Sequence, residues 1–480
     1  MLDELNPFDR CGKMKKTNER NDPMLFEKYI NTVDQVAEQA CAISDALWDN
    51  TELAYEEFAA VEMITKLLEE HGFTITRNIA GIPTAFTATY GSGKPAIGVQ
   101  AEYDGLDGIS QEAFCPVRKE RPGVTKGHGC GHNLFAGGSV AAVLAIQSYI
   151  KEVGKGSVTL FGCPAEEGGA GKVYMARDGA YKDVDAVVSW HPEKMYMVRT
   201  RPSLANTCVN FTFDGIAAHA GGAPQKGRSA LDAVELMNVG VQFLREHMDL
   251  TSRVHYAILD AGGTAPNQVQ AHATVQYLIR AVDSEGVREL YERVHRIAQG
   301  AALMTDTTMS TEFHSAYSNL ITIPTLQATA NEAMHDIPLP VPTEEDLAFA
   351  AEIQKTMKLT RAEAAGTPYA MKVLDPAPPV AHGGSTDTAD VSWVVPTVQM
   401  HIGNWVAGTP GHSWQAISQC RSPYGKRSML YAGKAVAGTA IRLMENPELL
   451  VQARKEFDEK TVGGYICPIP DDVLPPPLRK

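Results

Sequence analysis

The stretch KGHGCGHN, residues 126–133, places Cys130 and His132 two positions apart among glycines. Glycine lacks a Cβ and lets the backbone adopt positive φ, so a turn here could bring polar side chains close together. Thiolate and neutral imidazole are good ligands for zinc and similar ions. A Cys-x-His pair alone is weak evidence, because a cysteine is more often a small buried hydrophobic residue. The pair indicates a metal site only if further ligands accompany it.

Four residues of ligand type lie in comparable surroundings elsewhere in the chain. The stretch PAEEGG contains Glu166 and Glu167, SWHP contains His191, and GTPGHSW contains His412. Each could by itself belong to a solvated turn or be a hydrogen-bonded histidine at the end of a strand. Charged and imidazole groups beside glycines and after buried strands are poor core material, however. Taken together with the first pair, they predict a metal site with a general base beside it.

The pattern of apolar residues predicts an α/β domain that would bring these side chains together. Buried strands are expected at 95–105, 156–163 and 184–192, and a helix rich in small residues at 137–154. Buried strands that alternate with helices indicate a largely parallel sheet, in which ligands bind at the carboxyl ends of the strands. The first strand ends at Asp104, and the other two end at the glutamate pair and at the strand-end histidine.

A different pattern begins near residue 204. From there to about residue 322, the sequence predicts a strand, a helix, two strands, a helix and a strand. This β-α-β-β-α-β order is the ferredoxin-like arrangement of a small α+β domain. We therefore predict a catalytic α/β domain formed by residues 1–203 and 323–480, interrupted by a lid domain at 204–322.

The composition is that of an ordinary soluble protein of 480 residues with a net charge of −14, which argues against a nucleic-acid or anionic-membrane surface. The first residues contain no apolar signal-peptide core, and no apolar run approaches the roughly 20 residues of a membrane span. The eight cysteines show no disulfide spacing and indicate reduced thiols, so we expect a cytoplasmic protein. All except Cys130 are expected to be small hydrophobic residues: Cys11, Cys41, Cys115, Cys163, Cys208, Cys420 and Cys467.

The order of the motifs AEYDGL, GHGCGHN, PAEEGG, WHP, GIAAHAGGAP and GTPGHSW resembles the dinuclear metallo-amidohydrolases of the aminoacylase and carboxypeptidase type. Within them, the chain is similar to the branch that cleaves N-acyl and N-aroyl amino acids, over nearly its whole length. The resemblance implies a catalytic domain with an inserted ferredoxin-like lid, in agreement with the boundaries above. It also implies two divalent ions, zinc or manganese. A cysteine ligand favours zinc, because thiolate is soft and manganese prefers oxygen.

The resemblance also assigns roles to single residues. The implied metal ligands are Cys130, His132, Glu167, His191 and His412, with the cysteine bridging the two ions. Glu166 matches the general base, which would take a proton from the attacking water and pass it to the leaving amine. Asp104 would orient His132 from behind.

Two positions depart from the wider family. Asn133 stands where aspartate is usual, which weakens any supporting carboxylate role there. Glu102 stands where histidine or aspartate is usual, which leaves open whether a sixth protein ligand exists. Asp387 and Asp390, in GGSTDTADVSW, could support the site from behind, but a helix cap or a turn explains them equally well.

Three residues of the predicted lid resemble substrate-binding positions. His219 matches a histidine that polarises the scissile carbonyl, and Asn267 and Arg280 match positions that hold the substrate carboxylate. An arginine suits this role because its planar fork binds a carboxylate in a bidentate manner, although a surface arginine on a strand is the alternative. The other histidines are expected to be structural: His128, His247, His255, His272, His295, His314, His335, His382 and His401. The resemblance implies a homodimer formed through the lids, in which His219 reaches the active site of the partner subunit.

The expected function is metal-dependent hydrolysis of the amide bond of an N-acyl or N-aroyl amino acid, with p-aminobenzoyl-glutamate the first substrate to test. Two alternatives stay open. One is a dipeptidase or carboxypeptidase of the same family. The other is a non-catalytic member of a hetero-oligomer with a related chain, although the complete ligand set argues against a degenerate chain.

Overall fold

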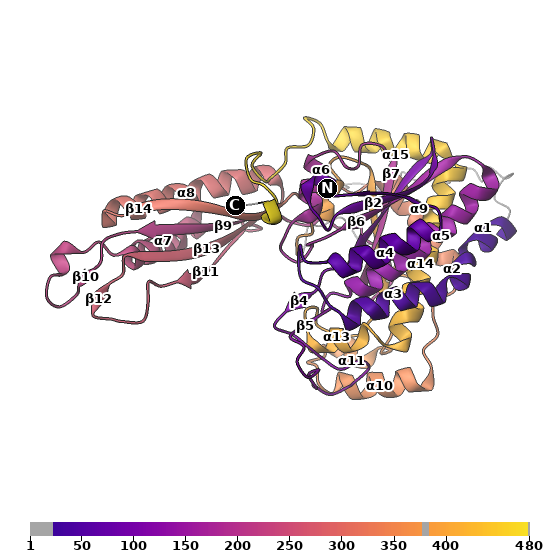
Figure 1. Cartoon of the computed structure of the whole chain (residues 1–480), viewed down its shortest axis with the longest axis horizontal. Coiled ribbons are helices and arrows are strands. Elements are labelled where there is room, and N and C mark those ends of the chain that lie inside the picture. The colour runs from indigo at the N-terminus through magenta and orange to yellow at the C-terminus, as the bar shows by residue number, and fades with distance from the viewer. Residues whose placement is uncertain (1–22, 377–383, 479–480) are drawn as a thin grey trace, which may run out of the picture.

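A seven-stranded mixed sheet forms the centre of the larger domain in the computed structural model, which describes residues 23–376 and 384–478 (Figure 1). In spatial order the strands are β1 (Thr74–Arg77), β2 (Phe86–Ser92), β6 (Gly156–Cys163), β3 (Ala96–Glu102), β7 (Ala186–Glu193), β15 (Thr397–Gly403) and β8 (Met197–Val198). The four strands from β6 to β15 run parallel, and antiparallel strands lie at both edges. Every residue of β3 is buried, as expected for a strand covered on both faces. The predicted α/β class with a largely parallel sheet is confirmed.

Helices cover both faces of this sheet. Because side chains alternate along a strand, Leu160 and Val188 join the core under α5 and α14, whereas Phe161 and Val187 pack under α6. The helices are α1 (Pro23–Ile30), α2 (Thr32–Gln35), α3 (Ala37–Asp49), α4 (Phe58–Glu70), α5 (His132–Val153), α6 (Gly171–Arg177), α9 (Pro324–Asp336), α10 (Glu344–Gln354), α11 (Arg361–Ala365), α12 (Thr388–Val391), α13 (Trp414–Gln419), α14 (Pro423–Glu445) and α15 (Pro447–Lys460). The short strands β4 (Leu106–Asp107) and β5 (Lys126–Gly127) pair with each other. Short 3-10 turns occupy Ile79–Gly81, Pro224–Lys226, Arg245–His247 and Pro476–Leu478.

Within the described residues, α5 is the one helix long and apolar enough to cross a membrane. Of its most apolar 18-residue window, 94% is buried inside the protein. It contacts α3, α14 and β3, so it is a core helix of the larger domain.

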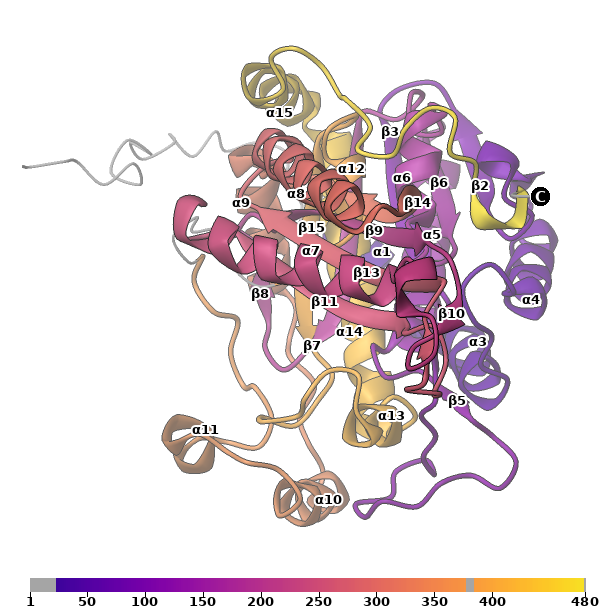
Figure 2. The ribbon, with the colours of Figure 1, turned by 90° about the vertical axis from the view of Figure 1, so that its left-hand side faces the viewer.

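The second domain is a four-stranded antiparallel sheet that projects from the first like an arm (Figure 1). Its strands, in spatial order, are β11 (Arg253–Asp260), β13 (His272–Ala281), β9 (Ala205–Asp214) and β14 (Thr308–Tyr317). Helices α7 (Ala230–Leu244) and α8 (Ser284–Thr305) lie side by side on one face (Figure 2). The chain order is the predicted β-α-β-β-α-β arrangement of a lid. The exact boundaries at 203/204 and 322/323 stay a prediction.

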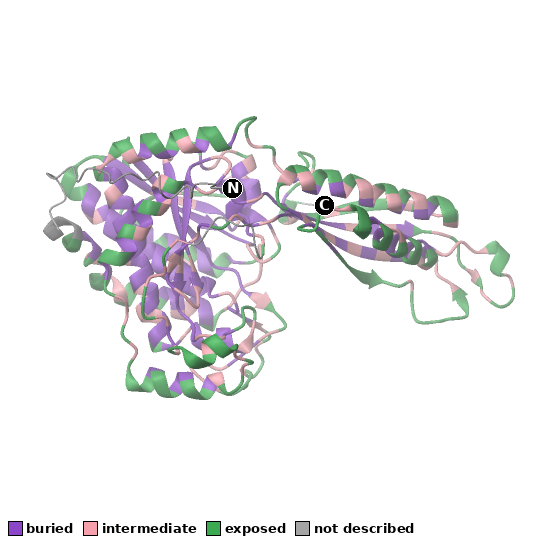
Figure 3. Ribbon diagram, turned by 180° about the vertical axis from the view of Figure 1, so that it is seen from behind, coloured by how far each residue is buried: buried purple, intermediate pink, exposed green. Residues whose placement is uncertain are grey.

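The far end of the lid consists of two short strands, β10 (Ala218–His219) and β12 (Gln268–Val269), which pair antiparallel. At one side of the lid sheet, β11 is an edge strand on which seven of eight residues are exposed (Figure 3). An exposed edge presents unpaired backbone groups to a second chain.

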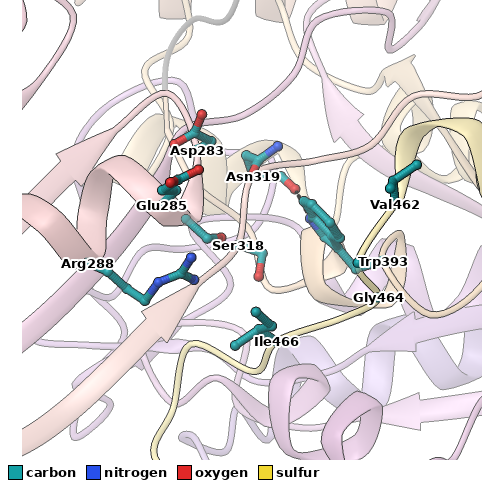
Figure 4. Close-up of a pocket in the computed structure, with 11 residues that line it drawn as sticks. Asp283, Glu285, Arg288, Ser318, Asn319, Trp393, Val462, Gly464 and Ile466 are labelled. Atoms are coloured by element: carbon teal, nitrogen blue, oxygen red, sulfur yellow. Dashed lines mark hydrogen bonds between the residues drawn. The ribbon is translucent and has the colours of Figure 1, made fainter.

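A pocket of about 240 Å³ lies where the two domains join (Figure 4). Arg288 of α8, Trp393 and Ile466 surround it, and none of the predicted metal ligands lines it. Nearby, Asp390 accepts hydrogen bonds from Ser318 N (2.9 Å) and Oγ (2.6 Å), just after β14, and from the Tyr465 hydroxyl (2.9 Å). Through these hydrogen bonds, Asp390 connects the end of the lid and the C-terminal segment to α12.

Candidate functional site

The loop that carries Cys130 lies between β5 and α5 and bends at a glycine. Gly131 has φ of 80°, and a Cβ at this position would lie 3.0 Å from Pro192, so a side chain would be both strained and crowded. His132 follows as the first residue of α5, where it is fully buried. The glycine thus lets the chain turn directly from the thiol into the helix that holds the imidazole.

The other ligand-type residues come from strand ends and a loop. Glu166 and Glu167 follow β6 in a tight turn, in which Gly168 N donates to Glu166 O at 2.7 Å. His191 lies near the carboxyl end of β7. His412 lies between β15 and α13, and its backbone N donates to Gly129 O at 3.0 Å, which joins this loop to the cysteine loop.

The structure brings these side chains into two overlapping groups. Cys130, His132 and His191 form one, and Cys130, Glu167 and His412 form the other; within each group the ligand atoms lie within 4.8 Å of one another. Cys130 Sγ is 3.4 Å from His191 Nε2, and His412 Nε2 is 3.4 Å from Glu167 Oε1. Cys130 belongs to both groups, which is the geometry of a residue shared by two ions.

The residues fit divalent ions by spacing and by unmet polar contacts. Ligand atoms at about 2.0–2.3 Å from one tetrahedral zinc ion are separated from each other by roughly 3.3–3.8 Å, as the pairs above are. Glu167 Oε1 and His132 Nε2 are buried and have no hydrogen-bond partner among the described residues, although each faces another ligand-type side chain, His412 at 3.4 Å and Glu102 at 3.1 Å. Unpaired buried polar atoms are costly, and a bound ion would satisfy both.

His132 is oriented by Asp104. Its Nδ1 lies 3.0 Å from Asp104 Oδ1, so Nδ1–H can donate there and Nε2 keeps its lone pair for an ion. The other oxygen of Asp104 accepts a hydrogen bond from Glu167 N at 2.8 Å. One buried carboxylate therefore holds one residue from each of the two groups.

Glu102 forms a third candidate group with His132 and Glu166. Glu102 Oε2 is 3.1 Å from His132 Nε2, which is close to the spacing of two ligands on one ion. Its Oε1 is 2.6 Å from Lys172 Nζ, and Lys172 Nζ is 2.5 Å from Asp387 Oδ1.

Lys172, which was not predicted from the sequence, is fully buried in α6 between these two carboxylates. A signal was present, because a lysine within the apolar stretch GKVYMA has no solvent-facing explanation. Asp387 is buried and holds both the amide and the ammonium of this lysine.

Glu166 lies beside the ligand groups, with its Oε2 3.9 Å from His132 Nε2. Burial, with the nearby charge of Glu102, raises the pKa of Glu166 to about 7. Burial likewise raises the pKa of Glu167 to about 8 and lifts the pKa of the Cys130 thiol well above its usual range. Several acidic groups in one buried place favour the binding of cations.

A cleft of about 1010 Å³ opens in front of these residues, between the two domains. The exposed face of the lid sheet, opposite α7 and α8, forms one wall through Cys208, Gln276 and Arg280. The larger domain forms the other wall through Arg199 and His401, among others. The cleft has the size of a small-molecule site.

The three predicted substrate-binding residues of the lid lie in two different places. Arg280 lines the cleft, where its Nη1 donates to Ser385 Oγ at 2.8 Å. His219 and Asn267 are exposed at the far end of the lid and do not line the cleft of their own chain. They are neighbours there, because Ala220 N donates to Asn267 O at 2.9 Å.

Two of the histidines expected to be structural, His314 and His401, line the cleft. His128 is buried, with Nε2 3.2 Å from Leu47 O, as a structural histidine would be. Asn133 is buried and donates to Ser44 Oγ at 3.0 Å and Cys420 O at 2.9 Å, away from the ligand atoms. His382 and Cys11 lie outside the described residues.

Comparison with known proteins gives a consistent family. The sequence model described as "Peptidase family M20/M25/M40" matches residues 98–403. The chain is 42% identical over 460 residues to one of the two p-aminobenzoyl-glutamate hydrolase subunits of Escherichia coli (strain K12), covering 91% of this chain and 96% of the relative. It is 29% identical over 450 residues to the Xaa-Arg dipeptidase of Mus musculus, covering 90% and 92%. The second subunit of the Escherichia coli hydrolase is 27% identical over 297 residues, covering 57% and 67%.

Solved structures share the fold. An aminobenzoyl-glutamate utilization protein from Klebsiella pneumoniae aligns with a TM-score of 0.60 at 18% identity, covering 85% of this chain and 97% of that one. The YXEP protein of Bacillus subtilis, described as a dinuclear metal binding peptidase of the M20 family, aligns with a TM-score of 0.56 at 16% identity, covering 86% and 99%. These likenesses concern the arrangement of a catalytic domain and a lid.

Proposed function

Because the chain belongs to the peptidase family M20/M25/M40, whose members are hydrolases, we propose that it cleaves the amide bond of an N-acyl or N-aroyl amino acid, with p-aminobenzoyl-glutamate as substrate and p-aminobenzoate and glutamate as products. The observation that carries the proposal is the pair of ligand groups that share Cys130, with Glu166 beside them at the floor of a cleft. The 42% identity to a chain of a hydrolase named for this substrate supports the choice.

The proposed cofactor is a pair of divalent ions, with zinc favoured over manganese. One ion would be held by Cys130, His132 and His191, and the other by Cys130, Glu167 and His412. When bound, such ions polarise the scissile carbonyl and acidify a water molecule. Thiolate is a soft ligand, which favours zinc.

Glu166 is the proposed general base and acid. It is not needed in either ligand group that shares Cys130, and its carboxylate lines the cleft where a substrate would lie. It would take a proton from the attacking water at one of its oxygens and deliver that proton to the nitrogen of the leaving amine. Asp104 would keep His132 in the tautomer that leaves Nε2 free.

The proposed substrate contacts involve two chains. Arg280 would bind the α-carboxylate from the lid wall of its own cleft. His219 and Asn267 would enter the cleft of a partner subunit, where the histidine would donate to the developing oxyanion and the asparagine would contact the carboxylate. The exposed edge strand β11 and the exposed Val239 and Phe243 on α7 support pairing of two lids.

Each of two alternatives is supported by an observation of its own. The Xaa-Arg dipeptidase relative favours a dipeptidase, and Glu193 and Asp375 in the cleft are acidic groups that a free α-amine could meet. The likeness to both chains of the Escherichia coli hydrolase favours a hetero-oligomer in which this chain needs a partner. A cytoplasmic location, expected from the cysteines and the N-terminal sequence, stays a prediction.

The test is hydrolysis by the purified chain alone, loaded with zinc or with manganese. N-aroyl and N-acyl derivatives of glutamate, aspartate and neutral amino acids are compared with dipeptides that carry a free α-amine. The proposal expects cleavage of N-aroyl substrates and requires a free α-carboxylate on each of them. Preference for dipeptides would favour the dipeptidase interpretation, and no turnover unless a related chain is added would favour the hetero-oligomer.

A further inference from the structure

Arg199 is a cleft arginine that the catalytic scheme leaves without a role. It follows β8 in the larger domain and lines the cleft together with Cys130, Glu166 and His191. Its guanidinium Nη1 donates to Gln399 Oε1 at 2.7 Å, and within residues 23–376 and 384–478 it forms no ion pair. A neutral amide thus engages one N–H of a group that has five.

Burial without a counter-ion is unfavourable for this side chain. Burial lowers the pKa of Arg199 to about 10, and Glu193 and Glu166 oppose the shift only from a distance. A half-buried cation that lacks a carboxylate of its own is suited to an anionic ligand, which would supply the missing bidentate partner.

The cleft is rich in basic residues although the chain has a net charge of −14. Four basic residues line it: Lys194, Arg199, Arg201 and Arg280. Apart from the proposed base and metal ligand, the acidic residues in the lining are Glu193 and Asp375. The four acidic residues of the lining balance the four basic ones, so the two divalent ions of the proposed function would make the cleft positive and favour a substrate with more than one negative charge.

Two half-buried arginines that form no ion pair in the described part of the chain face the cleft from different domains. Arg280 lies on β13 of the lid, and Arg199 lies on the opposite wall beside β15. A substrate with a single carboxylate would pair one of them and leave the other buried without an anion. A substrate with two carboxylates would pair both.

We propose that Arg199 is a specificity-determining residue that binds the side-chain carboxylate of an acidic amino acid, so that the enzyme prefers N-acyl derivatives of glutamate or aspartate. The inference rests on the proposed amidohydrolase function and names the residue that selects the acidic amino acid. Arg280 holds the α-carboxylate that all substrates share, and Arg199 binds the second carboxylate that only some of them carry.

The test compares N-(p-aminobenzoyl)-glutamate with N-(p-aminobenzoyl)-glutamine, a neutral analogue of nearly the same shape. Binding is measured by calorimetry on zinc-loaded Glu166→Gln protein, so that affinity is read without turnover. This protein should bind the glutamate compound about 10- to 100-fold more tightly, as one hydrogen-bonded charge contributes. Adding Arg199→Met should lower the affinity for the glutamate compound to that for the glutamine compound, which itself should not change.

Two matched variants separate this role from general charge and from the α-carboxylate site. Arg201→Met removes the same charge from an exposed arginine of the same cleft and should change both affinities by the same small factor. Arg280→Met should weaken both compounds equally, because both carry an α-carboxylate. Arg199→Lys, which keeps the charge but loses the planar fork, should retain part of the preference.

The inference is overturned if Arg199→Met weakens the binding of both compounds by the same factor. That result is expected if Arg199 only supports the structure through its hydrogen bond to Gln399. It is also overturned if the Glu166→Gln protein binds both compounds equally, a result that needs no variant at position 199. Failure of the proposed function has another signature: the zinc-loaded wild-type chain would not cleave either compound, whereas the difference in binding would persist.

Discussion

Cys130 Sγ lies 3.4 Å from His191 Nε2, and the same sulfur belongs to the group formed by Glu167 and His412. A side chain shared in this way couples the two halves of the site. Removing any other ligand should weaken one ion, whereas removing the cysteine should weaken both.

Cys130→Ser is therefore expected to lose most of both ions, measured by elemental analysis of protein purified without added metal. His191→Ala should keep about half of the wild-type metal content. Cys41→Ser, at a half-buried cysteine of α3, is the control and should bind metal normally. Equal metal content in Cys130→Ser and wild type would show that the thiol does not bind ions, and a manganese-only wild type would contradict the preference for zinc.

Glu166→Gln should retain both ions and lose activity. General acid–base catalysis contributes about 10²–10⁴-fold, so kcat should fall by this factor. Glu167→Gln is the matched variant at the adjacent position and should lose metal as well as activity. Wild-type turnover in metal-loaded Glu166→Gln would remove this residue from the mechanism.

The residues predicted as metal ligands, which the structure brings together, could be found from the sequence because each one lies in a short motif at a strand end or a glycine turn. Their meeting follows from the parallel sheet, since β6 and β7 deliver their polar ends to one edge. Asp104 could be predicted in the same way, because it follows β3 at the same edge of the sheet.

Contacts between distant parts of the chain could not be predicted in the same way. Lys172 and Asp387 are 215 positions apart, and no local pattern encodes their meeting. Arg199 resembles any arginine between two strands until Gln399 of β15 is placed beside it. His401 alternates with core residues along β15, so its sequence pattern does not show that its side chain faces the cleft.

Lys172→Met is expected to destabilise the protein strongly, because Glu102 and Asp387 would be left buried without their cation. Breaking a buried ion pair by removing one partner typically costs about 3–5 kcal/mol. The free energy of unfolding is measured by chemical denaturation of metal-free protein. Lys182→Met, at an exposed lysine nearby, should change it by less than about 0.5 kcal/mol. A similarly small effect at Lys172 would show that the two carboxylates are neutral without it.

Asp390 should make stability depend on pH. Burial raises its folded-state pKa to about 7, despite the hydrogen bonds from Ser318 and Tyr465. A raised carboxyl pKa means that the folded protein holds a proton that the unfolded chain releases above about pH 4. Its contribution is therefore full at low pH and is lost as the pH rises from about 4 to 7.

Asp390→Asn cannot titrate, so the measurement is the difference in unfolding free energy between wild type and this variant at several pH values. The wild type should lose stability relative to Asp390→Asn between about pH 5 and pH 7, by roughly 1.4 kcal/mol for each pH unit at most. A difference that does not change with pH would mean that the three donors keep Asp390 ionised throughout.

His219 and Glu166 should work together only across two subunits, because His219 is exposed at the far end of the lid and Glu166 lines the cleft. His219→Ala should lower kcat by about 10²–10³-fold, as the loss of one oxyanion donor does, without changing stability. A histidine that merely packs in the turn, where its Nδ1 accepts from Gly222 N at 2.9 Å, would instead affect stability.

Mixing His219→Ala with Glu166→Gln protein under conditions of subunit exchange should restore one working site per mixed dimer, about a quarter of the wild-type activity at equal amounts on mass-action grounds. Mixing His219→Ala with Glu166→Gln/His219→Ala protein is the control and should restore nothing. If the first mixture also stays inactive although labelled subunits demonstrably exchange, His219 does not act on the partner's site.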